Sequence, residues 1–179
     1  MKYHKEIKEF KTLLIIRVSL ISLYTALTLP IPFIAQNNQK ILSIILFIFG
    51  LTLIFNITND SFLVNKKGII YQTNFISNLF GKKSWELSWK DIRKIKSYPT
   101  SQGSKVNYFV NSTKQEFMFP RRIKNTEEFI SLIPDKLKVK IDKNNFSNPL
   151  WTYNLLTLLS LLMITAEIGT FTIFKDYQY

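Results

Sequence analysis

Three long apolar runs define the chain, at residues 13–35, 41–57 and 150–174, and a polar, basic segment separates the second from the third. A helix needs about 20 mostly apolar residues to cross the hydrocarbon core of a bilayer, and its backbone groups must be paired within the segment. The first and third runs meet this length, whereas the middle run has 17 residues. The pattern predicts three transmembrane helices, two N-terminal and one C-terminal.

The polar segment between the second and third runs has the pattern of an antiparallel β domain. Its short runs of β-branched and aromatic residues are separated by turn sequences, which is typical of strands. We expect strands at residues 61–64, 68–73, 84–88, 92–97, 105–111 and 115–119. Beyond them, Asn125 is placed to cap a helix with an acid, Glu128, three residues on. The apolar face of this helix would comprise Phe129, Ile130 and Ile133.

The predicted fold class is therefore membrane α+β, with three transmembrane helices around a small antiparallel β domain that carries one capping helix. The boundaries follow from the apolar runs and the turn sequences. We divide the chain into a basic leader (1–12), two transmembrane helices (13–35 and 41–57), a β domain (59–142), a linker (143–149), a third transmembrane helix (150–174) and a tail (175–179).

The distribution of positive charge predicts the orientation of these helices. The chain carries a formal net charge of +12, and residues 59–149 hold 17 Lys and Arg against eight Asp and Glu. The leader adds Lys2, Lys5, Lys8 and Lys11, whereas the connection at 36–40 has only Lys40. Because cytoplasmic loops retain positive charge, we expect the leader and the β domain on the cytoplasmic or stromal side of a plasma or thylakoid membrane.

Charged residues and prolines interrupt the apolar runs at a few positions. Glu167 would lie roughly 24 Å along the last helix, and an ionisable residue at such depth is a functional-site hypothesis by default. We favour a structural or partner-contact role for Glu167 over a proton or cofactor role. Arg17, near the start of the first helix, can extend back to the lipid headgroups. Pro30 and Pro32 lack a backbone donor and are expected to kink or end that helix.

No set of residues in the sequence indicates catalysis. The chain has no cysteine and a single histidine, His4, in the leader, whereas nucleophilic catalysis by serine needs a base within reach. The carboxylates of the β domain are scattered among lysines, and no His or Cys cluster or calcium-type acidic loop is present. We therefore predict a protein that is not an enzyme, without a cofactor, a metal site or a small-molecule substrate.

Basic and aromatic residues are the remaining candidates for binding. Each positive charge near an anionic leaflet adds about 1 kcal/mol of attraction, although general positive-inside charge is favoured over specific headgroup binding. Nucleic-acid binding is not expected, because no aromatic and basic stacking motif is evident. Trp151 and Tyr153 stand where aromatic residues anchor a helix at the interface. The candidate basic surface comprises Lys82, Lys83, Arg93, Lys94, Lys96, Arg121, Arg122 and Lys124.

Several of these residues carry a resemblance to known families. The stretches Asn65-Lys66-Lys67-Gly68 and Trp89-Lys90-Asp91-Ile92, followed by Phe119-Pro120 and the capped helix, resemble bacterial pleckstrin-homology-like (PH-like) domains found beside membrane helices. With Ser101-Gln102-Gly103 and Pro149-Leu150-Trp151, the whole chain resembles an uncharacterised cyanobacterial family of three-helix membrane proteins. The plan of two helices and a domain is also similar to the photosystem I assembly protein encoded in plastids.

Two functions follow as hypotheses. The first is a non-catalytic membrane scaffold, an assembly factor or accessory subunit that binds a larger membrane protein complex through its helices and its basic domain. The resemblance implies photosynthetic complexes as its leading partners. The alternative is a domain that senses anionic membrane lipids.

Overall fold

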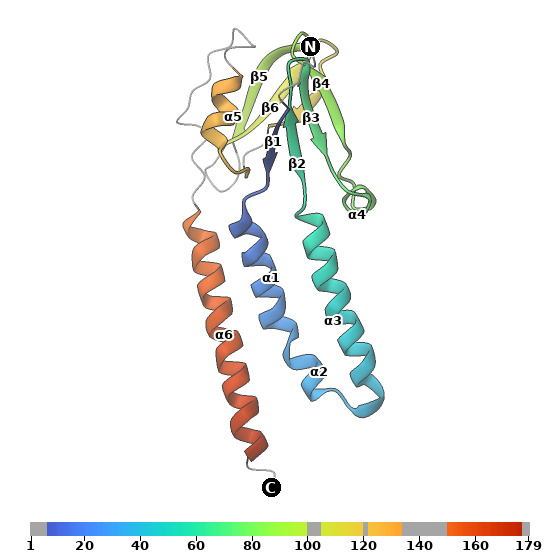
Figure 1. Cartoon of the computed structure of the whole chain (residues 1–179), viewed down its shortest axis with the longest axis vertical. Helices are drawn as coiled ribbons and strands as arrows, with labels where there is room; N and C mark the ends of the chain where they lie inside the picture. The colour runs from blue at the N-terminus through green and yellow to red at the C-terminus, as the bar shows by residue number, and fades with distance from the viewer. Residues whose placement is uncertain (1–6, 100–104, 120–121, 134–149, 177–179) are drawn as a thin grey trace, which may run out of the picture. The chain divides into compact units, whose positions relative to one another are not determined.

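The computed structural model describes residues 7–99, 105–119, 122–133 and 150–176 (Figure 1). The chain divides into two compact units that each combine distant parts of the sequence. We call residues 1–13 and 59–148 the β unit, and residues 14–58 and 149–179 the helical unit.

The described part of the β unit forms two antiparallel sheets. The first has the order β1 (Lys8–Lys11), β2 (Ser61–Val64), β3 (Gly68–Gln72) and β4 (Trp85–Ser88), and the second has the order β5 (Ile92–Pro99), β6 (Lys105–Asn111) and β7 (Glu116–Met118). Two short helices, α4 (Phe75–Leu79) and α5 (Thr126–Leu132), complete the described part of the unit. The six strands expected from the sequence are confirmed, with their ends within two residues of the expected positions.

Strand β1 was not expected, and it corrects the division of the chain at residue 12. The leader was separated from the β domain, but Lys8–Lys11 pairs with β2 along its whole length, from Lys8 opposite Val64 to Lys11 opposite Ser61. Phe10 is only 3% exposed and packs edge-on against Phe129, with ring centroids 5.2 Å apart. A four-residue strand with one apolar side chain is too short for its periodicity to be recognised.

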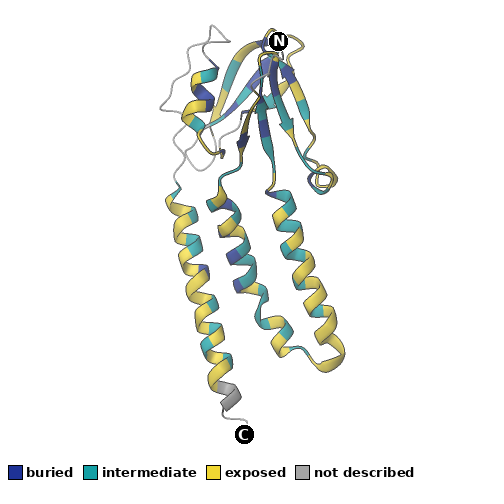
Figure 2. Cartoon of the chain, in the orientation of Figure 1, coloured by how far each residue is buried: buried dark blue, intermediate teal, exposed yellow. Residues whose placement is uncertain are grey.

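The core of the β unit lies among the inward side chains of both sheets and the apolar face of α5 (Figure 2). Phe129, Ile130 and Ile133 are buried, as the helical pattern predicted. Trp85 of β4 lies directly opposite Tyr71 of the neighbouring strand β3. Trp89 is buried, and its ring N–H donates to the carbonyl of Asn65 at 2.9 Å. The other members of this core are Phe10, Phe62, Val64, Ile69, Leu87, Ile92, Phe109, Phe119 and Ile123.

The start of α5 differs from the expected capping arrangement. Asn125 does precede the helix, but it has a left-handed backbone and its side chain caps no backbone N–H. Its amide instead donates to Glu128 at 3.4 Å, while the hydroxyl of Thr126 donates to the carbonyl of Ile123 at 2.9 Å. Glu128 also accepts a bond from Lys8 of β1 at 2.8 Å.

The helical unit consists of α1 (Leu14–Thr28), α2 (Pro30–Ile34), α3 (Asn37–Ile57) and α6 (Trp151–Asp176). Among the described residues, three helical segments are long and apolar enough to cross a membrane, at Leu14–Ile34, Asn37–Ile57 and Trp151–Ile173. The break between α1 and α2 falls at Leu29, directly before Pro30, where the prolines predicted it. Helix α3 begins at Asn37, so its 21 residues reach about 31 Å, which corrects the shorter run expected.

Polar contacts join the helices of this unit. Ser19 of α1 is fully buried, donates to the carbonyl of Tyr153 at 2.7 Å and lies 2.7 Å from the hydroxyl of Thr157. Tyr24 of α1 hydrogen-bonds carbonyls of α3 and lies over Gly50, where any Cβ atom would overlap its hydroxyl group. Small and hydroxyl-bearing residues are typical of close helix packing in membranes.

Arg17 has partners within the protein, whereas the sequence analysis expected its side chain to extend back to the lipid headgroups. Its guanidinium lies over the ring of Phe55, 4.7 Å from the centroid, and donates to the hydroxyl and the carbonyl of Thr58 at 3.3 Å each. Thr58 follows the last residue of α3, where unpaired carbonyl groups and the helix dipole favour a positive charge. Arg17 therefore joins the beginning of α1 to the end of α3.

The burial of Phe10 makes the leader a part of the folded core. We expect Phe10→Ala to lower the free energy of unfolding by about 3–5 kcal/mol, because it removes a ring packed on Phe129. Met118→Ala, an exposed position on β7, should change it by less than about 0.5 kcal/mol. Urea unfolding of the full chain in detergent, followed by tryptophan fluorescence, measures both. Equal stability of the two variants would contradict the placement of β1.

Candidate functional site

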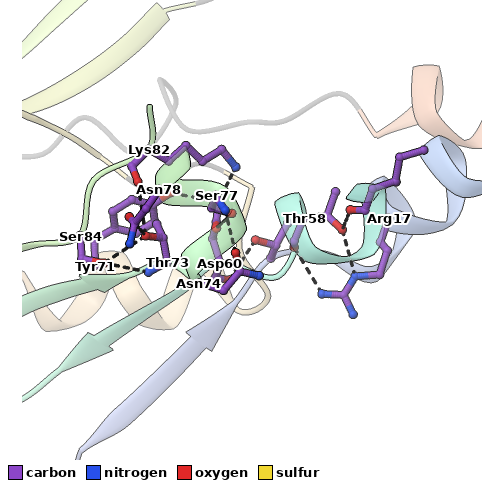
Figure 3. Close-up of polar contacts among 12 residues, drawn as sticks. Arg17, Thr58, Asp60, Tyr71, Thr73, Asn74, Ser77, Asn78, Lys82 and Ser84 are labelled. Carbon is purple, nitrogen blue, oxygen red and sulfur yellow. Dashed lines mark hydrogen bonds and ion pairs between the residues drawn. The ribbon is translucent and has the colours of Figure 1, made fainter. Parts of the chain in front are cut away.

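The carboxylate of Asp60, which lies just before β2, joins several elements of the β unit (Figure 3). Its side chain is only 11% exposed. It accepts hydrogen bonds from Lys82 at 2.6 Å, from the hydroxyl of Tyr71 at 2.9 Å and from the hydroxyl of Ser77 at 3.4 Å. The Asp60 cluster, which we define as these four residues, therefore joins the start of β2 to β3 and to the segment around α4.

The backbone of Asp60 also holds the end of β1. Its carbonyl accepts bonds from the N–H of Thr12 at 3.4 Å and from the hydroxyl of Thr12 at 3.1 Å. The next residue, Leu13, donates its N–H to the carbonyl of Arg122 at 2.9 Å. The chain thus enters the β unit at residue 59 and leaves it at residue 13 through one hydrogen-bonded end of the first sheet.

Residues 73–84 connect β3 to β4 and form what we call the α4 loop. The side chain of Asn74 caps α4 by accepting the N–H of Ser77 at 2.8 Å. The hydroxyl of Thr73 donates to Asn78 at 2.6 Å and lies 3.0 Å from the hydroxyl of Ser84. These contacts, most of which Figure 3 shows, give the loop a defined conformation.

Two further features fix the end of the α4 loop. Gly81 has a φ of 85°, a left-handed conformation that other residues rarely adopt. The N–H of Lys82 donates to the carbonyl of Ser77 at 3.0 Å, which closes the turn after α4. The loop therefore returns to the Asp60 cluster through the same residue, Lys82, that binds the carboxylate.

The outward side of the α4 loop is apolar. Phe75 is 82% exposed, Leu79 is 77% exposed and Phe80 is 59% exposed, whereas Ser77 is fully buried beneath them. Burying one such side chain is worth about 1.5–3 kcal/mol, so three exposed together form a strong candidate for a binding surface. Lys83, three residues after Phe80, is also exposed.

The members of the Asp60 cluster are paired with one another. Burial raises the pKa of Tyr71 far above its usual range, and the neighbouring charge of Asp60 adds to this shift. Tyr71 therefore stays a neutral hydrogen-bond donor, and Lys82 already pairs with the carboxylate. Among the residues that the structure describes, no three His, Cys, Asp or Glu side chains gather to hold a metal ion. The chemistry of the cluster is that of a structural support.

The predicted basic residues occupy separate parts of the β unit. Lys82 binds Asp60. The carbonyl of Arg122 accepts the N–H of Leu13, and the N–H of Lys124 donates to the carbonyl of Lys11. On the second sheet, Arg93 donates to Ser112 at 3.0 Å, and Lys96 pairs with Glu116 at 2.6 Å. Arg121 lies outside the described residues. One group, Lys82, Lys83, Arg122 and Lys124, thus belongs to the end where the chain enters and leaves, and the other, Arg93, Lys94 and Lys96, belongs to β5.

Glu167 lies on the face of α6 that packs within the helical unit. This face repeats every three or four residues, from Tyr153, which meets Ser19, to Phe171, whose ring stacks on Phe33 of α2 at 4.9 Å. One carboxylate oxygen of Glu167 is buried and has no hydrogen-bond partner among the described residues. The members of the stripe are Tyr153, Thr157, Ser160, Ile164, Glu167 and Phe171.

The two predicted interfacial anchors differ in their surroundings. Trp151 is 63% exposed at the start of α6, where its ring is available to lipid headgroups. Tyr153 is half-buried, and its carbonyl accepts the bond from Ser19. Tyr153 therefore also takes part in the contact between α1 and α6.

Sequence reasoning missed the Asp60 cluster and the apolar side of the α4 loop. Asp60, Tyr71, Ser77 and Lys82 come from different elements, and no local spacing indicates that they meet. The exposed residues did leave a signal, because Phe75, Leu79 and Phe80 are apolar residues within a segment between two strands, where turns are ordinarily polar.

The neutral state of Tyr71 predicts a dependence of stability on alkaline pH. In the unfolded chain a tyrosine releases its proton near pH 10, whereas the folded chain keeps it to a higher pH. The folded state then binds more protons, so this contribution to the free energy of unfolding is present below about pH 10 and is lost above it. Tyr71→Phe should therefore be less stable than wild type at neutral pH, and the difference should shrink above pH 10. Urea unfolding across this range tests it, and a difference independent of pH would contradict it.

With the fold and these groups established, comparison with known proteins identifies a relative. No protein-family profile matches the chain. The chain is 30% identical over 162 residues to the uncharacterized protein slr0269 of Synechocystis sp., in an alignment that covers 87% of this chain and 81% of the relative. The resemblance to an uncharacterised cyanobacterial family is thereby confirmed. The chain belongs to the same family as this Synechocystis protein.

Proposed function

We propose that the chain is a non-catalytic integral membrane scaffold, an assembly factor or accessory subunit of a larger membrane protein complex. The observation that carries this proposal is the buried carboxylate oxygen of Glu167, which has no partner among the described residues. A polar group in an apolar environment is unfavourable by several kcal/mol unless it is hydrogen-bonded. Because Glu167 as a whole is only half-buried, its side chain can turn outward to a hydrogen-bond donor on a transmembrane helix of another protein at this depth.

The cyanobacterial relative and the apolar helices support a membrane setting for this scaffold. We extend the proposal to a plasma or thylakoid membrane and, on the resemblance to the plastid assembly protein, to photosynthetic complexes as partners. Two antiparallel sheets and a following helix agree with a PH-like domain, which we propose as the type of the β unit. The domain would then present its basic groups to the same complex.

We further propose that the leader and the β unit occupy the cytoplasmic or stromal side. The pairing of β1 with β2 supports a common side for both ends of the segment from α1 to α3, because both strands belong to one sheet. The excess of Lys and Arg in these parts of the chain supports the cytoplasmic side.

The orientation predicts opposite labelling of two introduced thiols in a chain that has no cysteine of its own. Thr113→Cys, in the turn between β6 and β7, should react with a membrane-impermeant maleimide only after the cells are permeabilised. Asn38→Cys, at the start of α3, should react in intact cells whose outer barrier has been removed. The reverse pattern would contradict the proposed side.

The role of Glu167 is tested by capture from native membranes in mild detergent, with proteins quantified by mass spectrometry. Interhelical hydrogen bonds in membranes are worth about 0.6–1.7 kcal/mol, which corresponds to a loss of about 3- to 20-fold in affinity. We expect Glu167→Ala to lose partner subunits by this factor, and Glu167→Gln, which keeps hydrogen-bonding atoms, to lose less.

Thr165→Ala is the matched control, because the hydroxyl of Thr165 is on an exposed part of α6 and donates to the carbonyl of Leu162 of the same helix. It should capture the same proteins as wild type. Thermal unfolding of each variant shows whether the helical unit itself is intact. If Glu167→Ala is as stable as wild type and captures the same proteins in the same amounts, the scaffold proposal fails.

A further inference from the structure

The α4 loop presents an apolar surface that its own unit does not cover. Phe75, Leu79 and Phe80 are 82%, 77% and 59% exposed, and no other segment between strands of the described β unit exposes such a set of large apolar side chains. Contiguous exposed apolar residues rimmed by polar ones mark binding surfaces.

The loop cannot bury these side chains by folding inward, because its inner side is already occupied by polar contacts. Ser77 is fully buried, its N–H is bound to Asn74 and its hydroxyl lies 3.4 Å from the carboxylate of Asp60. Lys82 binds the same carboxylate at 2.6 Å. The apolar side chains are therefore held outward by the Asp60 cluster.

The covalent chain keeps the loop near the end of a predicted membrane helix. Helix α3 ends at Ile57, and Asp60 is three residues further along. Because consecutive Cα atoms are 3.8 Å apart, Asp60 lies at most about 11 Å from Ile57. The covalent chain therefore limits how far Asp60, and the residues that bind it, can lie from the end of this apolar helix.

The charge around the loop suits a lipid surface. Lys83 is exposed three residues after Phe80. Arg122 and Lys124 belong to the same end of the β unit, where their backbones hydrogen-bond those of Leu13 and Lys11. Asp60, the carboxylate that binds the loop, is already paired with Lys82. Amphipathic segments with apolar residues on one side and lysines beside them bind at the headgroup and acyl boundary, about 5–10 Å deep.

We propose that the α4 loop inserts into the interface of the bilayer that holds the chain's own helices. Phe75, Leu79 and Phe80 enter the acyl boundary, and Lys83 remains among the headgroups. This second attachment fixes the β unit against the lipid surface. It goes beyond the scaffold proposal, because it assigns a lipid contact to the β unit whether or not a partner protein is bound.

Spin labels on single cysteines test the insertion in the full chain reconstituted into lipid vesicles. Phe75→Cys and Leu79→Cys replace exposed side chains, so they leave the packed core unchanged, and the chain has no other thiol. Lys66→Cys is the matched control, since Lys66 is exposed in the turn at the other end of β2 and β3. Collision rates with oxygen, which enters lipid, and with a water-soluble nickel complex report the surroundings of each label.

We expect the ratio of oxygen to nickel collisions to be several-fold higher at positions 75 and 79 than at position 66. Vesicles with and without an anionic lipid should both show this difference, because the apolar side chains cause it. Equal ratios at all three positions would place the α4 loop in water and overturn the proposal. Labels at 75 and 79 shielded from both reagents would indicate burial against protein, which would also overturn it. The capture of partners by Glu167 variants is independent of either result.

Discussion

The pairing of β1 with β2 is the constraint on which the rest of the structure depends. Four residues before the first apolar helix form the edge of the sheet whose next strand begins just after the second helix. The segment from α1 to α3 therefore starts and ends at one folded unit. If the chain crosses a bilayer in this segment, it must do so an even number of times. The two apolar helical segments, Leu14–Ile34 and Asn37–Ile57, agree with this requirement.

Polar contacts secure both ends of this arrangement within their own units. In the β unit, Asp60 binds Thr12, Tyr71 and Lys82, so the end of β1 and the start of β2 share one set of hydrogen bonds. In the helical unit, Arg17 at the beginning of α1 binds Thr58 at the end of α3. Because both sets are half-buried, they hold a defined geometry better than exposed ion pairs do.

The sequence predicted most of the fold, because the deciding signals were local. The strands of residues 61–119 and the apolar face of α5 follow from periodicity, and the three helices that are apolar enough to cross a membrane follow from length and apolar content. Strand β1 was missed because a single apolar residue, Phe10, does not form the alternating pattern by which a strand is recognised. The length of α3 was underestimated because its first turn, Asn37 to Lys40, is polar but helical. Asn125 marked the correct helix start, although its side chain bonds differ from those expected.

The candidate sites were predictable in one case and not in the other. Glu167 stands out in the sequence because it is a charge within an apolar run. The Asp60 cluster depends on residues that only the sheet brings together, and Lys82 is 22 positions away from Asp60 in the chain. The eight basic residues were predicted as one surface, but the fold distributes the described ones between the first sheet's end and β5. The pairing of the strands, which composition does not reveal, therefore determines where these basic residues lie.

The central claim is that Lys8–Lys11 of the leader form a strand of the β unit in native membranes. A disulfide tests this claim most directly. Glu9 lies opposite Leu63 in the pairing of β1 with β2, and directly opposite residues have Cβ atoms about 4.5–5.5 Å apart. In native membranes, Glu9→Cys with Leu63→Cys should form a disulfide on mild oxidation, whereas Glu9→Cys with Lys66→Cys should remain reduced. A Glu9→Cys, Leu63→Cys chain that stays reduced, with its two thiols labelled from opposite sides of the membrane, would contradict the account.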